Sequence, residues 1–238
     1  ISYTARSVGE KTLRVEFAGD SKRKDNSNQD QRFLDQHEFR FVVHDDSVKV
    51  LIVEQFPRFE FRALEDLLRR ATNASGQARF DVSVVLGTAD PQLALEDNRL
   101  FTGIKEDRDW LFGFDVIVIG DVPVKLLTLE AQALLVDFVQ QRGGGLVFVA
   151  GERSLPGQYN GQPIAELFPA DVENYESTTL LEQPASLLLS QLGERTALTT
   201  VADSSETKSE NWKNLPGPFW LTQSPIMQTG TQVLVYAD

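Results

Sequence analysis

The chain has 238 residues, of which 41% are hydrophobic and 24% charged, and its formal net charge is −12 at neutral pH. This charge argues against a nucleic-acid-binding surface, which needs a basic patch. The sequence contains no cysteine, which excludes disulfides, thiolate metal sites and a cysteine nucleophile. No apolar run approaches the roughly 20 residues that span a bilayer, so we expect no direct membrane insertion.

The first 46 residues have a β pattern that differs from the rest of the chain. Residues 12–17 and 38–44 alternate polar and apolar side chains, as strands do, and a polar, turn-forming stretch separates them. A hairpin alone is marginally stable. We therefore expect residues 1–46 to add to another sheet or to end a preceding β-sandwich domain. The chain does not begin with Met and is expected to be part of a longer protein, whose neighbouring domains would be its partners.

Residues 47–238 are expected to form one α/β domain, because strands and amphipathic helices alternate. The predicted strands are 48–54, 80–86, 114–119 and 146–150, and the predicted helices are 58–72 and 129–142. The strands are nearly continuous in apolar character, as buried parallel strands are. This alternation favours right-handed crossovers. We predict a doubly wound, mostly parallel, flavodoxin-like sheet, preceded by the short N-terminal β segment.

The pattern loosens after residue 161. Here we expect short helices at 163–168 and 184–192, strands at 171–182, 196–202, 219–221 and 232–236, and a polar loop at 203–213.

The candidate site lies where the predicted strands end. In doubly wound folds, ligands bind at the carboxyl ends of the strands. This criterion selects residues 54–58, 120–121 and 151–154 together with the loop to residue 161. The candidate residues in these segments are Glu54, Arg58, Asp121, Glu152, Arg153 and Ser154. The arginines suit a small anionic ligand, such as a carboxylate or phosphate, or a protein partner. Alternatively, the charges pair with one another and fix the loops.

Motifs for catalysis, cofactors and metals do not appear. Ser154 lacks the G-x-S-x-G turn, and the only histidines, His37 and His44, precede the α/β core. The three glycines at 143–145 end a helix and precede a strand, whereas a dinucleotide fingerprint opens a helix. Asp45 and Asp46 adjoin His44. Such a group is more often an acidic patch where a strand meets a turn than a metal site. We therefore predict no catalytic residue, no cofactor and no metal.

Three segments also carry a resemblance: VLIVEQFPRFEFRALEDLLRR at 50–70, FDVIVIGDVP at 114–123 and LVDFVQQRGGGLVFVAGERS at 135–154. The segments YNGQPIAELFP at 159–169 and LPGPFWL at 215–221 support it. With them, residues 48–238 resemble the class I glutamine amidotransferase-like domain, which is flavodoxin-like. More narrowly, they resemble a subgroup found in large bacterial membrane-associated proteins with von Willebrand A and β-sandwich modules.

Active members of that family carry a catalytic cysteine in G-x-C-x-G after the corresponding strand, and a downstream His and Glu complete the triad. This chain has Ala150, Gly151 and Glu152 at that place, with no histidine after His44. The resemblance therefore implies the fold and the location of a pocket in a domain that lacks its catalytic triad. It also implies a location on the outer side of a bacterial membrane anchor.

Three functions are compatible with these observations. The first is a non-catalytic module that binds a ligand or a protein within a larger envelope protein. The second is an enzyme of another class that uses Glu152 or Asp121 as acid or base on a small molecule. The third is a structural spacer between neighbouring domains.

Overall fold

The computed structural model describes residues 9–19, 33–43, 47–73, 75–173, 176–201, 207–223 and 226–238. The chain divides into two compact units, Ile1–Ser47 and Val48–Asp238. His44 and the acidic pair beside it lie outside the described residues.

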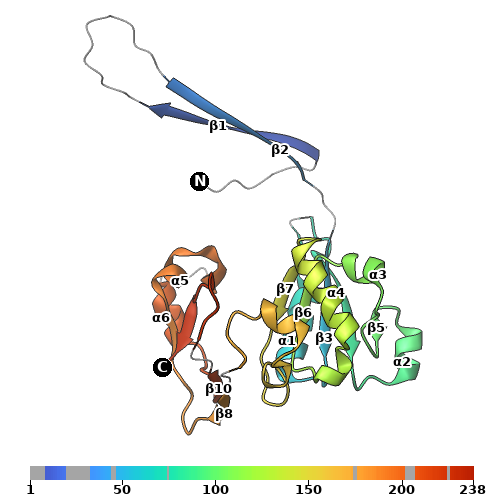
Figure 1. Cartoon of the computed structure of the whole chain (residues 1–238). Coiled ribbons are helices and arrows are strands. Elements are labelled where there is room, and N and C mark those ends of the chain that lie inside the picture. Colours follow the sequence, from blue (N-terminus) through green and yellow to red (C-terminus); the bar gives the residue numbers. More distant parts are fainter. Residues whose placement is uncertain are drawn as a thin grey trace, which may run out of the picture. The chain divides into compact units, whose positions relative to one another are not determined.

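The first unit contains the predicted hairpin. Strands β1 (Gly9–Gly19) and β2 (Phe33–Val43) pair antiparallel (Figure 1). Their register places Leu13 opposite Phe39, and Arg14 opposite Glu38, with which it forms an ion pair of 2.8 Å. Because side chains alternate across a strand, the apolar pair and the charged pair lie on opposite faces of the hairpin.

The centre of the second unit is a five-stranded, all-parallel sheet with the order β5-β4-β3-β6-β7 (Figure 1). Its strands are β3 (Val48–Glu54), β4 (Phe80–Leu86), β5 (Leu100–Phe101), β6 (Val116–Ile119) and β7 (Gly145–Phe148). When the two-residue β5 is left out, the longer strands have the order 2-1-3-4, counted from β3. This is the beginning of the flavodoxin-like order. The predicted α/β fold with a parallel sheet is therefore confirmed, and it is consistent with a flavodoxin-like fold.

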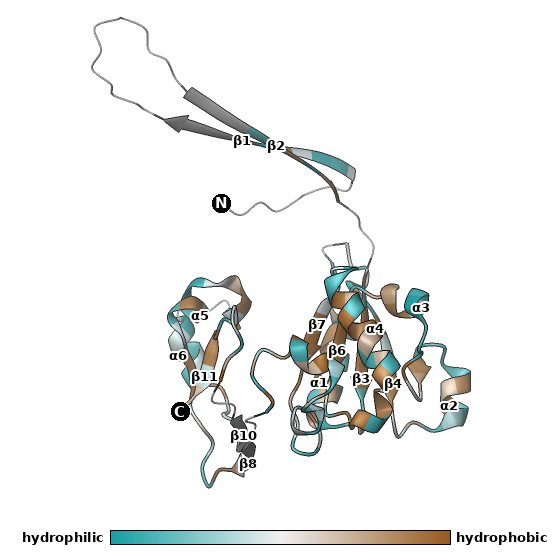
Figure 2. Ribbon diagram, in the orientation of Figure 1, coloured by the Kyte–Doolittle hydropathy of each residue, from teal (hydrophilic) through white to brown (hydrophobic). Residues whose placement is uncertain are grey.

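Each face of the sheet has its own hydrophobic core, because alternate residues of β3 point to opposite faces. Leu51 and Val53 pack in the cluster that contains Leu135 and Phe138 of helix α4 (Leu129–Gln140). Helices α3 (Arg108–Phe112) and η3 (Pro163–Leu167) contribute to the same cluster. Figure 2 shows the predominantly hydrophobic colouring of the central strands.

The opposite face is covered by helix α1 (Phe59–Arg70), whose Phe61 packs with Val50 and Ile52 of β3. This face is more open over β7. Val147 lies on it, because its neighbour in the sheet register is Val118, which belongs to the same cluster as Ile52. Val147 is nevertheless 46% exposed. The α1 side of β7 thus carries apolar surface in contact with solvent.

The connections contain further short elements. The polar stretch after β4 forms α2 (Pro91–Glu96), β5 and α3, with Asp90 and Asp107 capping the two helices. After β6 and β7, the chain forms the 3-10 turns η1 (Val124–Leu126) and η2 (Gly157–Tyr159).

The C-terminal part consists of two small antiparallel sheets and short helices. Strand β8 (Glu176–Leu180) pairs with β10 (Trp220–Gln223), and β9 (Leu187–Leu189) pairs with β11 (Val235–Ala237). The helical elements are α5 (Gln191–Arg195), η4 (Ala197–Thr199) and α6 (Lys208–Lys213). Trp212 of α6 donates a hydrogen bond of 2.7 Å from Nε1 to the carbonyl of Thr199.

Three predictions for this part are wrong. The segment 184–192 contains strand β9, because pairing with β11 overrides the helical preference of leucine, and a helix begins only after Ser190 caps it. The segment 196–202 forms the 3-10 turn η4 rather than a strand. The predicted loop at 203–213 contains α6, which starts at a capping box formed by Thr207 and Glu210.

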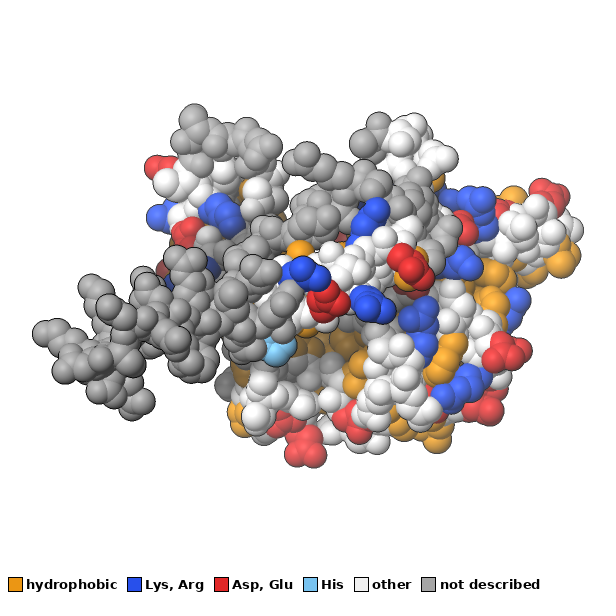
Figure 3. Space-filling view, turned by 90° about the horizontal axis from the view of Figure 1, so that it is seen from above, with side chains coloured by type: hydrophobic (Ala, Val, Ile, Leu, Met, Phe, Trp, Pro, Cys, Tyr) orange, Lys and Arg blue, Asp and Glu red, His pale blue; other side chains and the backbone are white. Residues whose placement is uncertain are grey.

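Acidic and basic side chains are interspersed on the face that Figure 3 shows. Ion pairs in the α/β core include Arg108–Asp137 at 2.6 Å, Arg142–Asp115 at 3.0 Å and Arg69–Glu65 at 2.9 Å. Such exposed pairs contribute little to stability. Within the described part of the chain, no helix has the length and apolar character needed to cross a membrane.

Candidate functional site

All six candidate residues lie at the carboxyl end of the parallel sheet. Glu54 is the last residue of β3, Arg58 is the N-cap of α1, Asp121 follows β6, and the loop with Glu152, Arg153 and Ser154 follows β7. The carboxyl ends of parallel strands share one edge, so this convergence follows from the topology. The structure divides the residues into two separate arrangements.

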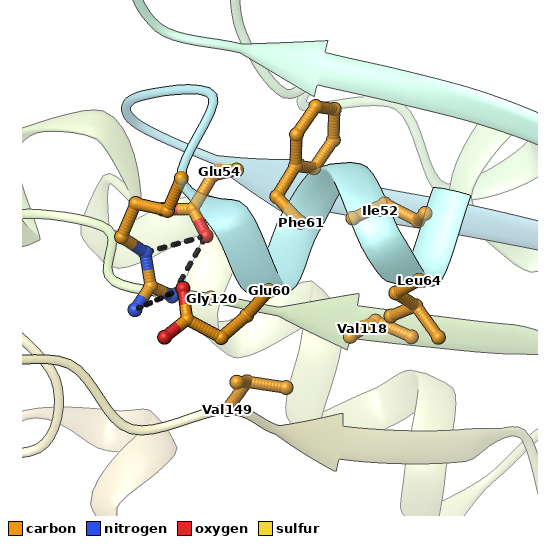
Figure 4. Close-up of a pocket in the computed structure, with 9 residues that line it drawn as sticks. Ile52, Glu54, Glu60, Phe61, Leu64, Val118, Gly120 and Val149 are labelled. Atoms are coloured by element: carbon orange, nitrogen blue, oxygen red, sulfur yellow. Dashed lines mark hydrogen bonds and ion pairs between the residues drawn. The ribbon is translucent and has the colours of Figure 1, made fainter. Parts of the chain in front are cut away.

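The first arrangement is an ion pair between the buried Glu54 and the partly buried Arg58. Oε2 of Glu54 accepts hydrogen bonds from Nη2 of Arg58 at 2.8 Å and from Nε at 3.2 Å, while Oε1 accepts from the backbone N–H of Gln55 at 3.0 Å (Figure 4). Glu54 is only 2% exposed. A buried carboxylate needs such a partner, because its desolvation is costly. The pair therefore fixes the start of α1 against the end of β3.

Gly120 makes room for this pair. A Cβ atom at position 120 would overlap Oε2 of Glu54 and would lie 3.2 Å from Nη2 of Arg58. The glycine at the end of β6 thus allows a charged pair to occupy the space beside the strand.

The second arrangement is centred on Asp121, which is 4% exposed. Its Oδ2 accepts a hydrogen bond from the backbone N–H of Arg153 at 3.0 Å. Its Oδ1 accepts from the N–H groups of Ser154 at 2.7 Å and Leu155 at 2.9 Å. Three consecutive backbone donors therefore surround one carboxylate, so the loop after β7 is bound to the end of β6.

Gly151 and Tyr159 complete this arrangement. A Cβ at position 151 would overlap the carboxyl group of Asp121, so only glycine allows the loop to approach it. Tyr159 is fully buried and donates a hydrogen bond of 2.8 Å from its hydroxyl to the carbonyl of Val122. Burial, and secondarily the negative charge of Asp121, raises the pKa of the Tyr159 hydroxyl far above its usual range. The hydroxyl therefore remains a neutral donor.

Two of the predicted loop residues face solvent. Glu152 and Arg153 have exposed side chains, whereas Ser154 is buried. The guanidinium of Arg153 lies over the ring of Phe56, 5.0 Å from its centroid. Phe56 is itself 40% exposed, and Phe59 at the start of α1 is 81% exposed. This rim thus presents two aromatic rings and a cation to solvent.

A small hollow lies between α1 and the sheet, on the α1 face. It is lined by Ile52, Glu54, Arg58, Glu60, Phe61, Leu64, Val118, Gly120 and Val149 (Figure 4). Its volume is about 20 Å³, which corresponds to roughly one water molecule. Sites for drug-sized ligands are typically ~300 Å³ or larger. The hollow is therefore too small for such a ligand in this conformation.

The described residues at this edge of the sheet do not include an activated nucleophile. Ser154 is buried, and its N–H is engaged with Asp121. Both histidines of the sequence belong to the first unit. Among the described residues, no group of three or more His, Asp or Glu side chains is placed to bind a metal ion.

The strand-end segments that the sequence selects contain Phe56, Gly120, Gly151 and Tyr159, but the sequence assigned no role to these four residues. The two glycines stand where strands end beside charged residues, and such glycines often mark a close approach of the backbone. This signal could have identified the role of the two glycines. The partners of Phe56 and Tyr159 depend on loop conformation and carry no comparable local signal.

No protein-family model matches this chain, and comparisons with curated proteins and with solved structures find no significant similarity.

Proposed function

We propose that residues 48–238 form a non-catalytic protein-interaction module with a doubly wound, amidotransferase-like fold. Its parent would be a larger bacterial envelope protein, anchored in the membrane, with this module on the extracytoplasmic side. The resemblance of the strand-end segments supports the family and the setting. Neighbouring domains of the same parent chain are the first candidate partners.

One observation carries the non-catalytic part of the proposal: the buried polar groups at the strand ends bind one another. Glu54 is paired with Arg58, and the carboxylate of Asp121 accepts three backbone N–H bonds. A general acid or base needs a reactive oxygen within reach of substrate. The oxygens of Asp121 bond to the loop after β7, and Glu152 lies in solvent rather than in a deep pocket.

The exposed rim supports a protein partner rather than a small ligand. Phe56, Phe59 and Arg153 face solvent beside a hollow that holds about one water. Aromatic residues and arginine are enriched at protein interfaces and dominate their hot spots.

Calorimetric titration of the purified chain with the adjoining domain of its parent protein tests the proposal. Replacing Phe56, Phe59 and Arg153 together by alanine is expected to weaken binding at least about tenfold, since each is a hot-spot type. Leu95→Ala, at a position 87% exposed on α2, is the matched control and should bind normally. If the triple variant binds like the unmodified chain, the rim is not the interface, and a spacer role gains support.

A glutaminase assay tests the absence of catalysis. No turnover above background is expected from the purified chain. Glutamine hydrolysis that Glu152→Ala abolishes would contradict the non-catalytic assignment.

A further inference from the structure

Arg153 is an exposed residue whose backbone is held on both sides of its Cα atom. Its N–H donates a hydrogen bond of 3.0 Å to Oδ2 of the buried Asp121, and its carbonyl accepts one of 3.1 Å from Nε2 of Gln158. The N–H groups of the next two residues bond to the same carboxylate. The backbone therefore cannot carry Arg153 to another place without breaking several of these bonds.

The side chain of Arg153 is positioned as well. Its guanidinium lies 5.0 Å from the ring centroid of Phe56, in a cation–π contact. Such a contact favours one position of a side chain that otherwise samples many rotamers. An arginine that is ordered in advance loses less conformational entropy when it binds a partner. Arg153 thus has the pre-organisation of a binding residue.

The N–H donors of this guanidinium are not used within the described part of the chain. No described carboxylate lies within ion-pair distance, that of the adjacent Glu152 included, and the Phe56 ring offers no lone pair. Arg58, the other arginine at this edge, differs. Its Nη2 lies 2.8 Å from Oε2 of Glu54, and its Nη1 lies 4.0 Å from Oε2 of Glu60. One cation of the edge is therefore neutralised inside the protein, and the other is presented to solvent.

We propose that Arg153 binds a carboxylate of the partner protein, from an Asp or Glu side chain that an apolar residue adjoins. This inference rests on the proposed protein-interaction function and states the chemistry of its partner. The guanidinium fork holds a carboxylate with two parallel hydrogen bonds, which a lysine could not form. Phe56 is 40% exposed and offers apolar surface to the adjoining residue of the partner.

The charges around Arg153 favour a single carboxylate over a phosphate. Glu152 precedes Arg153 and is exposed, and the whole chain has a net charge of −12. Electrostatic repulsion is proportional to the charge of the ligand, and a phosphate group carries about −1.5 to −2 at neutral pH, whereas a carboxylate carries a single charge. The same acidic surface favours a partner that is neutral or basic outside its binding carboxylate.

NMR titration of the whole chain with short capped peptides tests the chemistry of the ligand. The first peptide, acetyl-Ser-Gly-Leu-Glu-Phe-Gly-Ser-amide, has one carboxylate between two apolar residues, and the second replaces its Glu by Gln. The Glu peptide should shift the Nε–H signal of Arg153 with a dissociation constant of about 1 mM or below. The Gln peptide should bind at least about threefold more weakly, because it lacks the charge.

Inorganic phosphate, at the same ionic strength, distinguishes the two anions and should bind no more tightly than the Glu peptide. Equal affinities for the Glu and Gln peptides would overturn the proposal. Tighter binding of phosphate than of the Glu peptide would overturn it as well, because Arg153 would then belong to a phosphate site.

Variants of two arginines test whether the effect belongs to this site, with the backbone amide shifts of residues 151–155 as the measure of binding. Arg153→Gln should reduce the affinity for the Glu peptide to that for the Gln peptide. Arg153→Lys keeps the charge but lacks the fork, so it should bind at least about twofold more weakly than the unmodified chain. An Arg153→Lys variant that binds as well as the unmodified chain would contradict the paired hydrogen bonds.

Arg79 provides the matched control. It is an exposed arginine, it lies 5.8 Å from the ring centroid of Phe80, and it precedes β4 at the opposite edge of the sheet. Arg79→Gln should therefore bind the Glu peptide normally. An equal loss for Arg79→Gln and Arg153→Gln would show an effect of net charge alone and would overturn the proposal.

Circular dichroism and the melting temperature show whether each variant is folded. Arg153→Gln retains the backbone bonds to Asp121 and Gln158, so it should fold. If it does not, Phe56→Leu gives an independent test, because it keeps an apolar side chain but removes the ring beside the guanidinium. The Glu peptide should then bind about twofold more weakly. An unchanged affinity would contradict the pre-organisation of Arg153 and, with it, the proposal.

Titration with the adjoining domain of the parent protein separates this inference from the proposed function. Arg153→Gln alone should weaken that binding at least about threefold and reduce its salt dependence. If the triple alanine variant loses binding but Arg153→Gln does not, the rim remains the interface and the carboxylate site is overturned. If the adjoining domain does not bind although the Glu peptide binds at Arg153, the carboxylate site stands and the adjoining domain is not the partner.

Discussion

Two buried carboxylates at neighbouring strand ends are stabilised in different ways. Glu54 and Asp121 are 2% and 4% exposed, respectively. Glu54 is paired with the side chain of Arg58, whereas Asp121 is surrounded by three backbone N–H groups of a loop that lies more than 30 residues further along the chain. The first depends mainly on one replaceable side chain, since only one backbone N–H, that of Gln55, bonds to Glu54. The second depends on a loop conformation, and in turn fixes it.

This difference predicts which carboxylate has the larger structural role. Removing Arg58 breaks its ion pair with Glu54 at 2.8 Å and a longer, exposed one with Glu60 at 4.0 Å. Removing Asp121 leaves three donors of a partly buried loop without an acceptor and releases this loop from the end of β6. The variants below test this order, beginning with the largest expected effect.

Asp121→Ala is expected to lower the free energy of unfolding by about 4 kcal/mol, because hydrogen bonds to a charged group contribute about 1.5–3 kcal/mol each and are not additive. Urea denaturation measures the change. Asp121→Asn retains an accepting oxygen and should lose about half as much. A loss below about 1 kcal/mol for the alanine variant would mean that the loop finds other acceptors, and the comparison would fail.

Arg58→Ala is expected to cost about 3 kcal/mol, because it leaves the Glu54 carboxylate buried without its partner. The double variant Arg58→Ala with Glu54→Leu removes the stranded charge and should recover most of this loss. If the double variant is no more stable than the single one, the cost comes from lost packing of the arginine stem rather than from the ion pair.

Tyr159→Phe is expected to lower stability by about 1 kcal/mol, the typical net contribution of one neutral hydrogen bond. Chemical denaturation near neutral pH measures it. The change is smaller than for Asp121 because the carbonyl of Val122 keeps a second lone pair, and because the ring itself continues to fill the core.

The same variant should also remove a pH dependence of stability that Tyr159 causes. Because burial and the charge of Asp121 raise the pKa of Tyr159 in the folded state, the unfolded chain loses this proton first as the pH rises. Stability from this group is therefore fully present below about pH 10, the unperturbed tyrosine pKa, and declines above it by up to about 1.4 kcal/mol per pH unit. The difference between the chain and Tyr159→Phe should show this decline. A difference that stays constant up to pH 11 would contradict the burial argument.

Phe56→Ala should have the smallest effect, about 0.5 kcal/mol, because cation–π contacts at exposed positions are weak. Thermal unfolding measures it against Leu95→Ala. An effect larger than that of Arg58→Ala would show that the rim, and not the buried pair, stabilises this edge.

The sequence predicts the location of the site much better than its contacts. The strands ending at Glu54 and before Asp121 are β-branched and apolar, so their parallel alignment and common edge could be predicted. The three bonds to Asp121 could not, because they depend on the backbone of residues 151–155, which is set by tertiary packing. The place of β7 at the end of the sheet could not be predicted either, since local sequence does not reveal which strand ends the sheet.

The C-terminal errors have a similar origin. Leu187–Leu189 has no strong local preference for a strand, and only its pairing with β11 decides its conformation. Helix α6 is the opposite case. Its signal, Thr207 followed by Glu210, is local and was present in the sequence.

The alternation along β3 has a consequence for insertions. Leu51 and Val53 supply one core and Val50 and Ile52 the other, and Glu54 ends the strand on the side of Arg58. Adding one residue near the start of β3 would exchange the two sets of side chains and direct the carboxylate to the opposite face. Adding two would restore the alternation. Tolerance at this position should therefore depend on whether the number of added residues is odd or even, a parity rule that no single substitution could reveal.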